Sequence, residues 1–218
     1  HVDTGYSRHP AFGFEAQPWL DVAAAETFFV PRGDGPVDPP PEPGDGVDPL
    51  LGGFNPGHGT KSASTIVGRA AGAAYHGIAP GCPIVPVRIC DTVLINDRQN
   101  EFGQAVDHLL QHDVSVITVC LGIWLATTER VVRKAVDRAY EQGVIMVCAA
   151  GQYVDDVVSP ASLPRTIAVA GTTFEDVPWG HSCHGPEVDL SAPAADIRRA
   201  VTSRQGRCGT AGGGAGPS

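Results

Sequence analysis

A histidine between two glycines is the residue of this sequence best suited to moving a proton. His58 lies between Gly57 and Gly59, and small residues follow over 60–68. Because glycine has no side chain, the backbone and a ligand can both come close to the imidazole. Thr60 is a suitable N-cap, which predicts that His58 lies at the start of a helix. A loop histidine that only caps the helix is an equally good interpretation of these residues alone.

Other chemistry-bearing positions stand where predicted strands end. Asp3 follows a very short strand, since only His1 and Val2 precede it, and we expect a processed or fragmentary start. Gly122 and Gly151 each follow a predicted central strand. In parallel α/β sheets the active site lies beyond the carboxyl ends of the strands. These positions therefore predict a site at that edge of the sheet.

The elements that must position these residues alternate regularly along the chain. Four apolar runs predict strands buried on both faces, at residues 84–89, 114–119, 144–149 and 166–170. Two stretches with one apolar face at helical spacing predict helices, at residues 101–111 and 127–142. Alternation of this kind is typical of parallel strands joined by helical crossovers. The predicted fold class is therefore α/β, with three α/β/α layers around a mostly parallel sheet.

One domain is expected to account for most of the 218 residues, a length sufficient for a closed hydrophobic core. We assign residues 1–208 to it, with an irregular insertion rich in Pro, Gly and Asp at about 31–57. Residues 209–218 are predicted to form a flexible Gly-rich tail. A solvated acidic loop is the preferred interpretation of the insertion. Structural calcium remains an alternative, although the carboxylates do not match the EF-hand spacing; they are Asp34, Asp38, Glu42, Asp45 and Asp48.

Composition excludes several classes of function. The net charge of -9 argues against nucleic-acid binding and against attachment to an anionic membrane. No apolar run reaches the roughly 18 residues that a membrane span needs. The start carries no signal peptide, so the chain is either cytoplasmic or had its start removed. Cysteine spacing does not decide between these; Cys82 could pair with Cys90, or Cys183 with Cys208.

Seven short motifs follow one another along the chain. They are Asp-Thr-Gly at 3–5, Gly-His-Gly-Thr at 57–60, Gly-Ile-Ala-Pro at 77–80, Cys-Leu-Gly at 120–122, Ala-Ala-Gly-Gln at 149–152, Ser-Pro-Ala at 159–161 and His-Gly-Pro-Glu-Val-Asp-Leu-Ser-Ala-Pro at 184–193. One such motif would mean little, but their shared order and approximate spacing make chance improbable. From residue 1 to about 210, the chain resembles the subtilisin-like serine peptidases, the subtilases.

This resemblance implies an endopeptidase that hydrolyses peptide bonds by an Asp-His-Ser mechanism. Asp3 would orient the ring of His58, and His58 would take the proton of a serine hydroxyl. Gln152 stands where the family has the asparagine that stabilises the oxyanion, and its longer side chain makes misplacement a concern. The remaining implied residues bind substrate at a strand end or in the pocket before the cut bond: Cys120, Leu121, Gly122, Ala149, Ala150, Gly151, Pro160 and Ala161.

The position of the nucleophile departs from the family pattern. Gly209 and Thr210 match, but Ala211 stands where the serine is expected. Glycines follow in place of the helix that would hold a serine, so the C-terminal part of the fold is predicted to be missing. Thr210 is one residue away, and Ser218 in a flexible tail would not be positioned for attack. We therefore expect the chain as written to be inactive or very slow.

Three accounts of Ala211 stay open. The chain could be a fragment or frame-disturbed product of a peptidase, a natural pseudo-peptidase that binds peptides or has a structural role, or a deliberate inactivation. The resemblance implies secretion, a pro-segment, peptide or protein substrates, and no required cofactor or metal. Without the family's C-terminal helices, apolar sheet surface would be left uncovered.

Two further functions are less favoured. A zinc site at His181, Cys183 and His184 lacks a fourth ligand at finger-like spacing. A nucleotide-binding α/β domain would need a glycine fingerprint, which this sequence does not contain.

Overall fold

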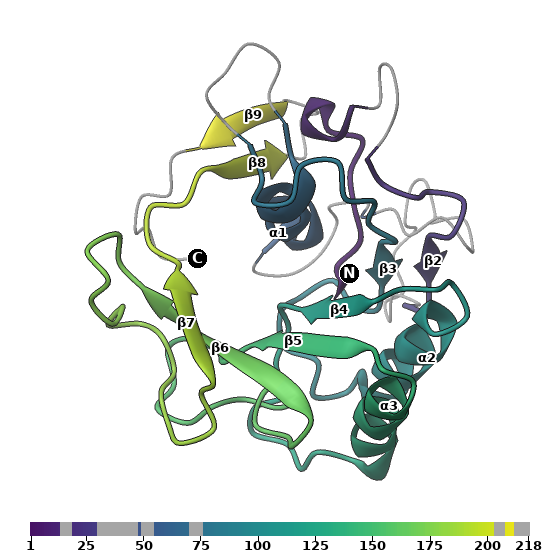
Figure 1. Cartoon of the computed structure of the whole chain (residues 1–218), viewed down its shortest axis with the longest axis vertical. Coiled ribbons are helices and arrows are strands. Elements are labelled where there is room, and N and C mark those ends of the chain that lie inside the picture. Colours follow the sequence, from purple (N-terminus) through teal and green to yellow (C-terminus); the bar gives the residue numbers. More distant parts are fainter. Residues whose placement is uncertain (14–18, 30–47, 49–54, 70–75, 203–207, 212–218) are drawn as a thin grey trace, which may run out of the picture. The chain divides into compact units, whose positions relative to one another are not determined.

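The computed structural model describes residues 1–13, 19–29, 48, 55–69, 76–202 and 208–211 (Figure 1). The chain divides into two compact units, one comprising His1–Val93 with Ile197–Ser218 and the other Leu94–Asp196. Nearly all of the predicted insertion, and residues 212–218 of the predicted tail, lie outside the described residues. None of the described helices has the length and apolar character needed to cross a membrane.

The first unit contains three very short parallel strands. They follow the order β2 (Glu26–Thr27), β3 (Val87–Arg88) and β1 (Val2–Asp3). The strand predicted at 84–89 is thus wrong in length, because only two of its residues form β3. Pro86 precedes β3 and has no N–H group to donate to a neighbouring strand, which limits the ladder.

Helix α1 (His58–Val67) is the main helix of the first unit. It packs against β1, the 3-10 helix η1 (Pro10–Phe12) and β8 (Arg199–Thr202). Its small residue Ser64 is buried, and the Ser64 hydroxyl accepts a hydrogen bond from the Ala200 main-chain nitrogen at 2.8 Å. A slim helix face therefore allows close packing, as the small residues predict. The apolar core of this unit consists of Tyr6, Phe12, Leu20, Ala25, Ala63, Val67 and Ile84.

Strand β8 pairs in antiparallel fashion with β9 (Cys208–Ala211). Residues 209–211, assigned to a flexible tail from the sequence, are therefore part of a strand. The glycine-rich composition does not prevent this, because the hydrogen bonds between β8 and β9 are made by the main chain and do not depend on side chains.

The second unit is a regular α/β assembly. Its four parallel strands follow the order β4 (Val116–Val119), β5 (Ile145–Ala149), β6 (Thr166–Thr172) and β7 (Leu190–Pro193). Helix α2 (Gln99–Leu109) precedes β4, and α3 (Arg130–Glu141) connects β4 to β5. These bounds differ from the predicted ones by at most three residues. The mostly parallel α/β fold class is confirmed.

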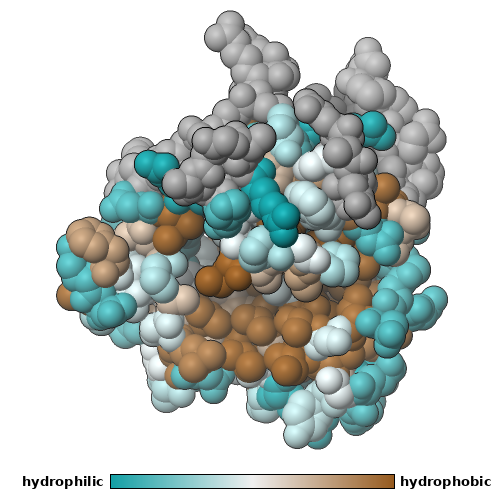
Figure 2. Space-filling model, turned by 45° about the horizontal axis from the view of Figure 1, so that its top comes forward, coloured by the Kyte–Doolittle hydropathy of each residue, from teal (hydrophilic) through white to brown (hydrophobic). Residues whose placement is uncertain are grey.

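Only one face of these strands is well covered. The paired residues Ile117 and Met146 are buried, whereas Val116, Ile145 and Leu190 are exposed. The prediction that both faces are buried is therefore wrong for β4 and β5, because the two helices of this unit lie on the same side of the strands (Figure 1). Figure 2 shows a broad apolar area on the face of the molecule that it presents.

Candidate active site

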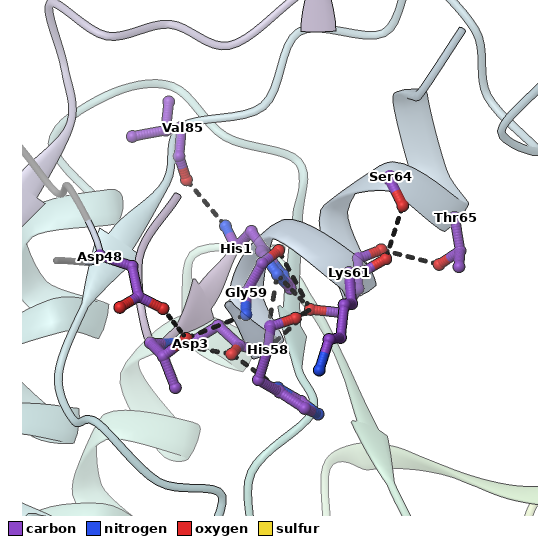
Figure 3. Close-up of polar contacts among 11 residues, drawn as sticks. His1, Asp3, Asp48, His58, Gly59, Lys61, Ser64, Thr65 and Val85 are labelled. Atoms are coloured by element: carbon purple, nitrogen blue, oxygen red, sulfur yellow. Dashed lines mark hydrogen bonds and ion pairs between the residues drawn. The ribbon is translucent and has the colours of Figure 1, made fainter. Parts of the chain in front are cut away.

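Asp3 and His58 meet in the first unit. Nδ1 of His58 lies 2.7 Å from Oδ1 of Asp3 (Figure 3). The Asp3 side chain is buried, whereas 18% of the His58 side chain is exposed. Because an ionised carboxylate can only accept hydrogen bonds, we assign the proton to Nδ1 of His58. The neutral ring then carries a lone pair on Nε2, which is the form that a general base requires.

The chain delivers the two side chains from the ends of two elements. Asp3 is the last residue of β1, and His58 is the first residue of α1. The N-cap of α1 is Gly57, whose φ of 71° lies in the left-handed region that favours glycine. The prediction that Thr60 caps the helix is wrong, because Thr60 lies inside the first turn. Its hydroxyl instead accepts a hydrogen bond from the Ser7 main-chain nitrogen at 2.8 Å.

The second glycine beside His58, Gly59, is required by a close contact and not by its backbone conformation. A Cβ atom at Gly59 would overlap the main-chain oxygen of Gly5. The start of α1 can therefore approach the turn after β1 only where residue 59 has no side chain. This close approach brings the histidine to the carboxylate.

A buried threonine and aspartate hold the main chain around His58. The Thr4 hydroxyl accepts a hydrogen bond from the Gly59 nitrogen at 3.0 Å and donates one to Asp48 Oδ2 at 2.9 Å. The same Asp48 oxygen accepts from the Gly57 nitrogen at 3.1 Å. Asp48 is buried, so its assignment to a solvated acidic loop is wrong; the other four carboxylates of that loop lie outside the described residues.

The second oxygen of the Asp3 carboxylate also has polar neighbours. Ser62 Oγ lies 3.0 Å from Asp3 Oδ2, and Nε2 of the His1 ring lies 2.9 Å from Ser62 Oγ. The Thr4 nitrogen donates to Oδ1 at 2.7 Å. Sequence reasoning did not identify His1 or Ser62 as site residues. The four-residue spacing between His58 and Ser62, which places them on the same helix face, was the available signal.

Two ionisable groups near Asp3 and His58 have shifted pKa values, the Cys90 thiol and the Lys61 amine. Burial raises the pKa of the Cys90 thiol well above its ordinary value, and the Asp3 carboxylate raises it further. The pKa of Lys61 on α1 is lowered by burial and then by the positive charge of Arg199, with Asp48 acting in the opposite direction.

Cys82 and Cys90 are both free thiols, so the disulfide considered between them is not formed.

Three predicted site residues of the second unit follow the carboxyl ends of neighbouring parallel strands. Gly122 lies after β4, and its main-chain oxygen accepts a hydrogen bond from the Ile95 nitrogen at 2.9 Å. Gly151 lies after β5 with a φ of 109°, a conformation that favours glycine. The side chain of Gln152 comes next and is exposed, while its backbone pairs with Ser182.

The Ser-Pro-Ala motif lies beside the continuation of the Cys-Leu-Gly motif in the second unit. Ile123 and Ser159 form an antiparallel bridge, with hydrogen bonds of 2.7 and 3.3 Å. Pro160 and Ala161 are buried, as are Leu121 and Ala150; Cys120 and Ala149 are partly buried. The fold therefore gathers motifs that are about 37 residues apart in the sequence (159 against 122). A role for them in substrate binding stays a prediction.

Two residues that were candidates for zinc binding line a surface pocket. His181 and His184, together with Tyr153 and Asp155, border a hollow of about 300 Å³. Among the residues that the structure describes, no three His, Cys, Asp or Glu side chains are arranged to hold a metal ion.

Ala211, at the predicted nucleophile position, is the last residue of β9. Its backbone pairs with Arg199 of β8, and the preceding Thr210 pairs with Ala200. Both partners belong to the first unit.

A buried carboxylate bonded to Nδ1 of a partly exposed histidine is the arrangement that the acid–base pair of serine hydrolases has. The subtilase family model matches residues 2–214. The chain belongs to the subtilase family.

Individual relatives agree with this assignment. The minor extracellular protease Epr of Bacillus subtilis (strain 168) is 32% identical over 143 residues, which cover 65% of this chain and 22% of that protein. The subtilisin-like proteinase Mp1 of Magnaporthiopsis poae is 32% identical over 155 residues, covering 66% of this chain and 36% of that protein. The chain thus spans only about a fifth to a third of these curated relatives.

Solved structures give the same fold. A cold adapted subtilisin-like serine proteinase has a TM-score of 0.66 and 25% identity, covering 97% of this chain and 67% of that one. The prenylagaramide maturation protease PagA has a TM-score of 0.66 at 21% identity, with the same coverage, and supports the fold alone. The subtilisin-like α/β fold is confirmed.

Proposed function

We propose that this chain is the catalytic domain of a serine-type endopeptidase, in which Asp3 and His58 form the acid–base pair. The observation that carries the proposal is the 2.7 Å contact between Asp3 Oδ1 and His58 Nδ1. It leaves Nε2 of His58 to take a proton from a hydroxyl nucleophile, and the buried carboxylate stabilises the imidazolium that results. The substrate class is peptides or proteins, as the names of the protease relatives suggest.

We assign the oxyanion donor to Gln152. Its side chain is exposed directly after β5, so its amide is available to a bound substrate. A glutamine amide lies one methylene farther from the backbone than that of asparagine, and a misplaced donor weakens transition-state stabilisation. Loss of one such donor costs ~10²–10³ in rate.

We assign substrate binding to the two motif segments of the second unit. The main chain of Cys120, Leu121 and Gly122 pairs with the substrate, and small residues leave room for the side chain before the cut bond. Support comes from the Ile123–Ser159 bridge, which holds the two segments together. The small residues are Ala149, Ala150, Gly151, Pro160 and Ala161.

Ala211 is proposed to occupy the nucleophile position, which makes the chain as written inactive in covalent catalysis. Support comes from the sequence Gly209-Thr210 before it and from the family match, which extends to residue 214. We also propose secretion, a pro-segment that assists folding and no required cofactor. Support for secretion comes from the extracellular relative.

A fluorophosphonate probe tests the nucleophile assignment, because it reacts covalently only with an activated hydroxyl. We expect no labelling of the unmodified chain and slow labelling of Ala211→Ser. Labelling is expected to vanish in the double variant Ala211→Ser/His58→Gln. The matched control Gly212→Ser introduces the same hydroxyl one residue away and should stay unlabelled. Labelling of the unmodified chain, or equal labelling of both serine variants, would contradict the assignment.

A non-catalytic peptide-binding protein is the second candidate, favoured by the alanine at residue 211. It retains the Asp3–His58 bond but uses it only as structure. Fluorescence anisotropy of a labelled casein digest distinguishes the two. Saturable binding by the unmodified chain, with no labelling of Ala211→Ser, favours the binding protein.

A further inference from the structure

Two histidines lie beside the Asp3 carboxylate, and each is close to a different one of its two oxygens (Figure 3). His58 contacts Oδ1 through Nδ1, whereas Nε2 of His1 lies 3.6 Å from Oδ2. The side chain of His1 is 2% exposed, so it is far less accessible than that of His58. The main-chain nitrogen of His1 donates to Val85 O at 2.8 Å, which fixes its backbone beside β1. His1 is therefore held in place by hydrogen bonds and belongs to this buried polar site.

The position of Nε2 decides where the His1 ring carries a proton. Nε2 faces both Ser62 Oγ at 2.9 Å and the carboxylate oxygen of Asp3 at 3.6 Å. A lone pair on Nε2 would point at the lone pairs of an anion in a buried place, which is electrostatically costly. An N–H group there interacts favourably with both oxygens. These contacts favour the tautomer of His1 that carries its proton on Nε2.

A proton on Nε2 of His1 excludes His1 as the acceptor of the Ser62 hydroxyl proton. A hydroxyl has one proton, and Ser62 Oγ has three acceptors within reach: Asp3 Oδ2 at 3.0 Å, His58 O at 2.9 Å and Gly59 O at 3.3 Å. Serine inside a helix commonly donates back to the carbonyl of the preceding turn. When His1 donates to Ser62 Oγ, the hydroxyl is polarised and becomes a stronger donor to the charged acceptor.

We propose that His1 and Ser62 form a hydrogen-bonded relay that positions Asp3 from the side opposite His58. His1 donates from Nε2 to Ser62, and Ser62 donates to Oδ2 of Asp3. The carboxylate then has its Oδ1 available to His58 and cannot rotate without breaking the bond to Ser62. His1 is a positioning residue, since it acts on His58 only through Ser62 and Asp3. This inference rests on the proposed role of Asp3 and His58 as the acid–base pair.

Nitrogen-15 NMR of the imidazole rings in the full chain tests the relay directly. We expect Nε2 of His1 and Nδ1 of His58 to give signals of protonated ring nitrogens near neutral pH. A deprotonated Nε2 in His1 would overturn the proposal, because Ser62 would then have to donate to His1 instead of Asp3. The readout needs no peptide cleavage, so it stands or fails independently of the peptidase assignment.

Variants test whether the relay stabilises the bond between Asp3 and His58. Ser62→Ala removes the link, and we expect exchange of the His58 Nδ1 proton with water to accelerate about tenfold. Ser64→Ala is the matched control, because Ser64 is a serine of the same helix whose hydroxyl bonds Lys61 O and the Ala200 nitrogen. It should leave this exchange rate unchanged.

His1 variants separate positioning from simple packing. His1→Leu removes the donor and should accelerate the exchange as Ser62→Ala does, whereas His1→Gln keeps an N–H donor and should restore part of the slow exchange. Circular dichroism verifies that each variant is folded. Equal exchange rates in the unmodified chain, Ser62→Ala and His1→Leu would overturn the proposal, and so would equal acceleration by Ser62→Ala and Ser64→Ala.

Discussion

The second unit holds its geometry with long parallel strands and helices packed on an apolar face, whereas the first holds its site with strands of two residues and side-chain hydrogen bonds. In the second unit, β6 alone is seven residues long. In the first, the Thr4 hydroxyl and Asp48 carboxylate anchor main-chain nitrogens on both sides of His58. The contrast teaches that regular elements form the scaffold of the second unit, whereas the contact between Asp3 and His58 depends on a few directional hydrogen bonds.

The largest expected effect concerns the apolar core of the second unit. Phe102 on α2 is fully buried, and Phe102→Ala should lower the free energy of unfolding by about 3–5 kcal/mol, because it leaves a cavity. Phe174→Ala in the same unit is the control, since Phe174 is exposed. Urea denaturation measures both. If Phe102→Ala also accelerated exchange of the His58 Nδ1 proton under native conditions, the contrast between the units would fail.

The next effect lies in the polar framework of the first unit. Thr4→Val preserves the shape of the side chain but removes the hydroxyl that serves the Gly59 nitrogen and Asp48. A buried nitrogen left without its acceptor should cost about 1–3 kcal/mol. We expect faster exchange of the His58 Nδ1 proton as well. Thr4→Ser keeps the hydroxyl and should behave nearly as the unmodified chain; equal losses for both variants would mean that packing, not bonding, matters here.

Buried thiols in both units predict a common alkaline weakening. Burial raises the pKa of Cys148 in the second unit and of Cys90 in the first above the ordinary value of 9.0. The unfolded chain therefore loses thiol protons above about pH 9 that the folded chain keeps. Stability is full below that pH and falls as pH rises, by roughly 1 kcal/mol per pH unit for each thiol.

Urea denaturation between pH 8 and 10.5 measures this slope. Cys148→Ala should make the slope shallower, and Cys82→Ala, at an exposed cysteine, should not. An unchanged slope in Cys148→Ala would show that other groups cause the alkaline weakening.

The smallest effect is expected at the surface of the second unit. Arg138 on α3 contacts Asp107 on α2, with Nη2 and Nε 2.6 and 2.7 Å from Oδ1. Both side chains are largely exposed, so Arg138→Gln should cost at most about 1 kcal/mol, and less in high salt. Lys134→Gln on the same helix is the control. A loss as large as that of Thr4→Val would contradict the view that directional polar bonds matter chiefly at the buried site.

The sequence predicted the second unit well because its signals are local. Apolar spacing within residues 101–111 and 127–142 marked α2 and α3, and apolar runs marked β4, β5 and β6 with small errors at the ends. The first unit was predicted less well, since its strands are too short to leave a pattern. The pairing of Asp3 with His58 came from the resemblance of short motifs, and the structure confirms their contact.

By itself, the sequence determined the family, the alternation of strands and helices, and which carboxylate and histidine belong together. Only the tertiary structure decided that Gly57 rather than Thr60 caps α1, that Asp48 is buried, and that His1 and Ser62 reach Asp3. The periodicity of apolar residues predicts the secondary structure of a segment and which of its faces is buried. It holds no information on hydrogen bonds between residues that are 44 to 61 positions apart, which form only when the chain has packed.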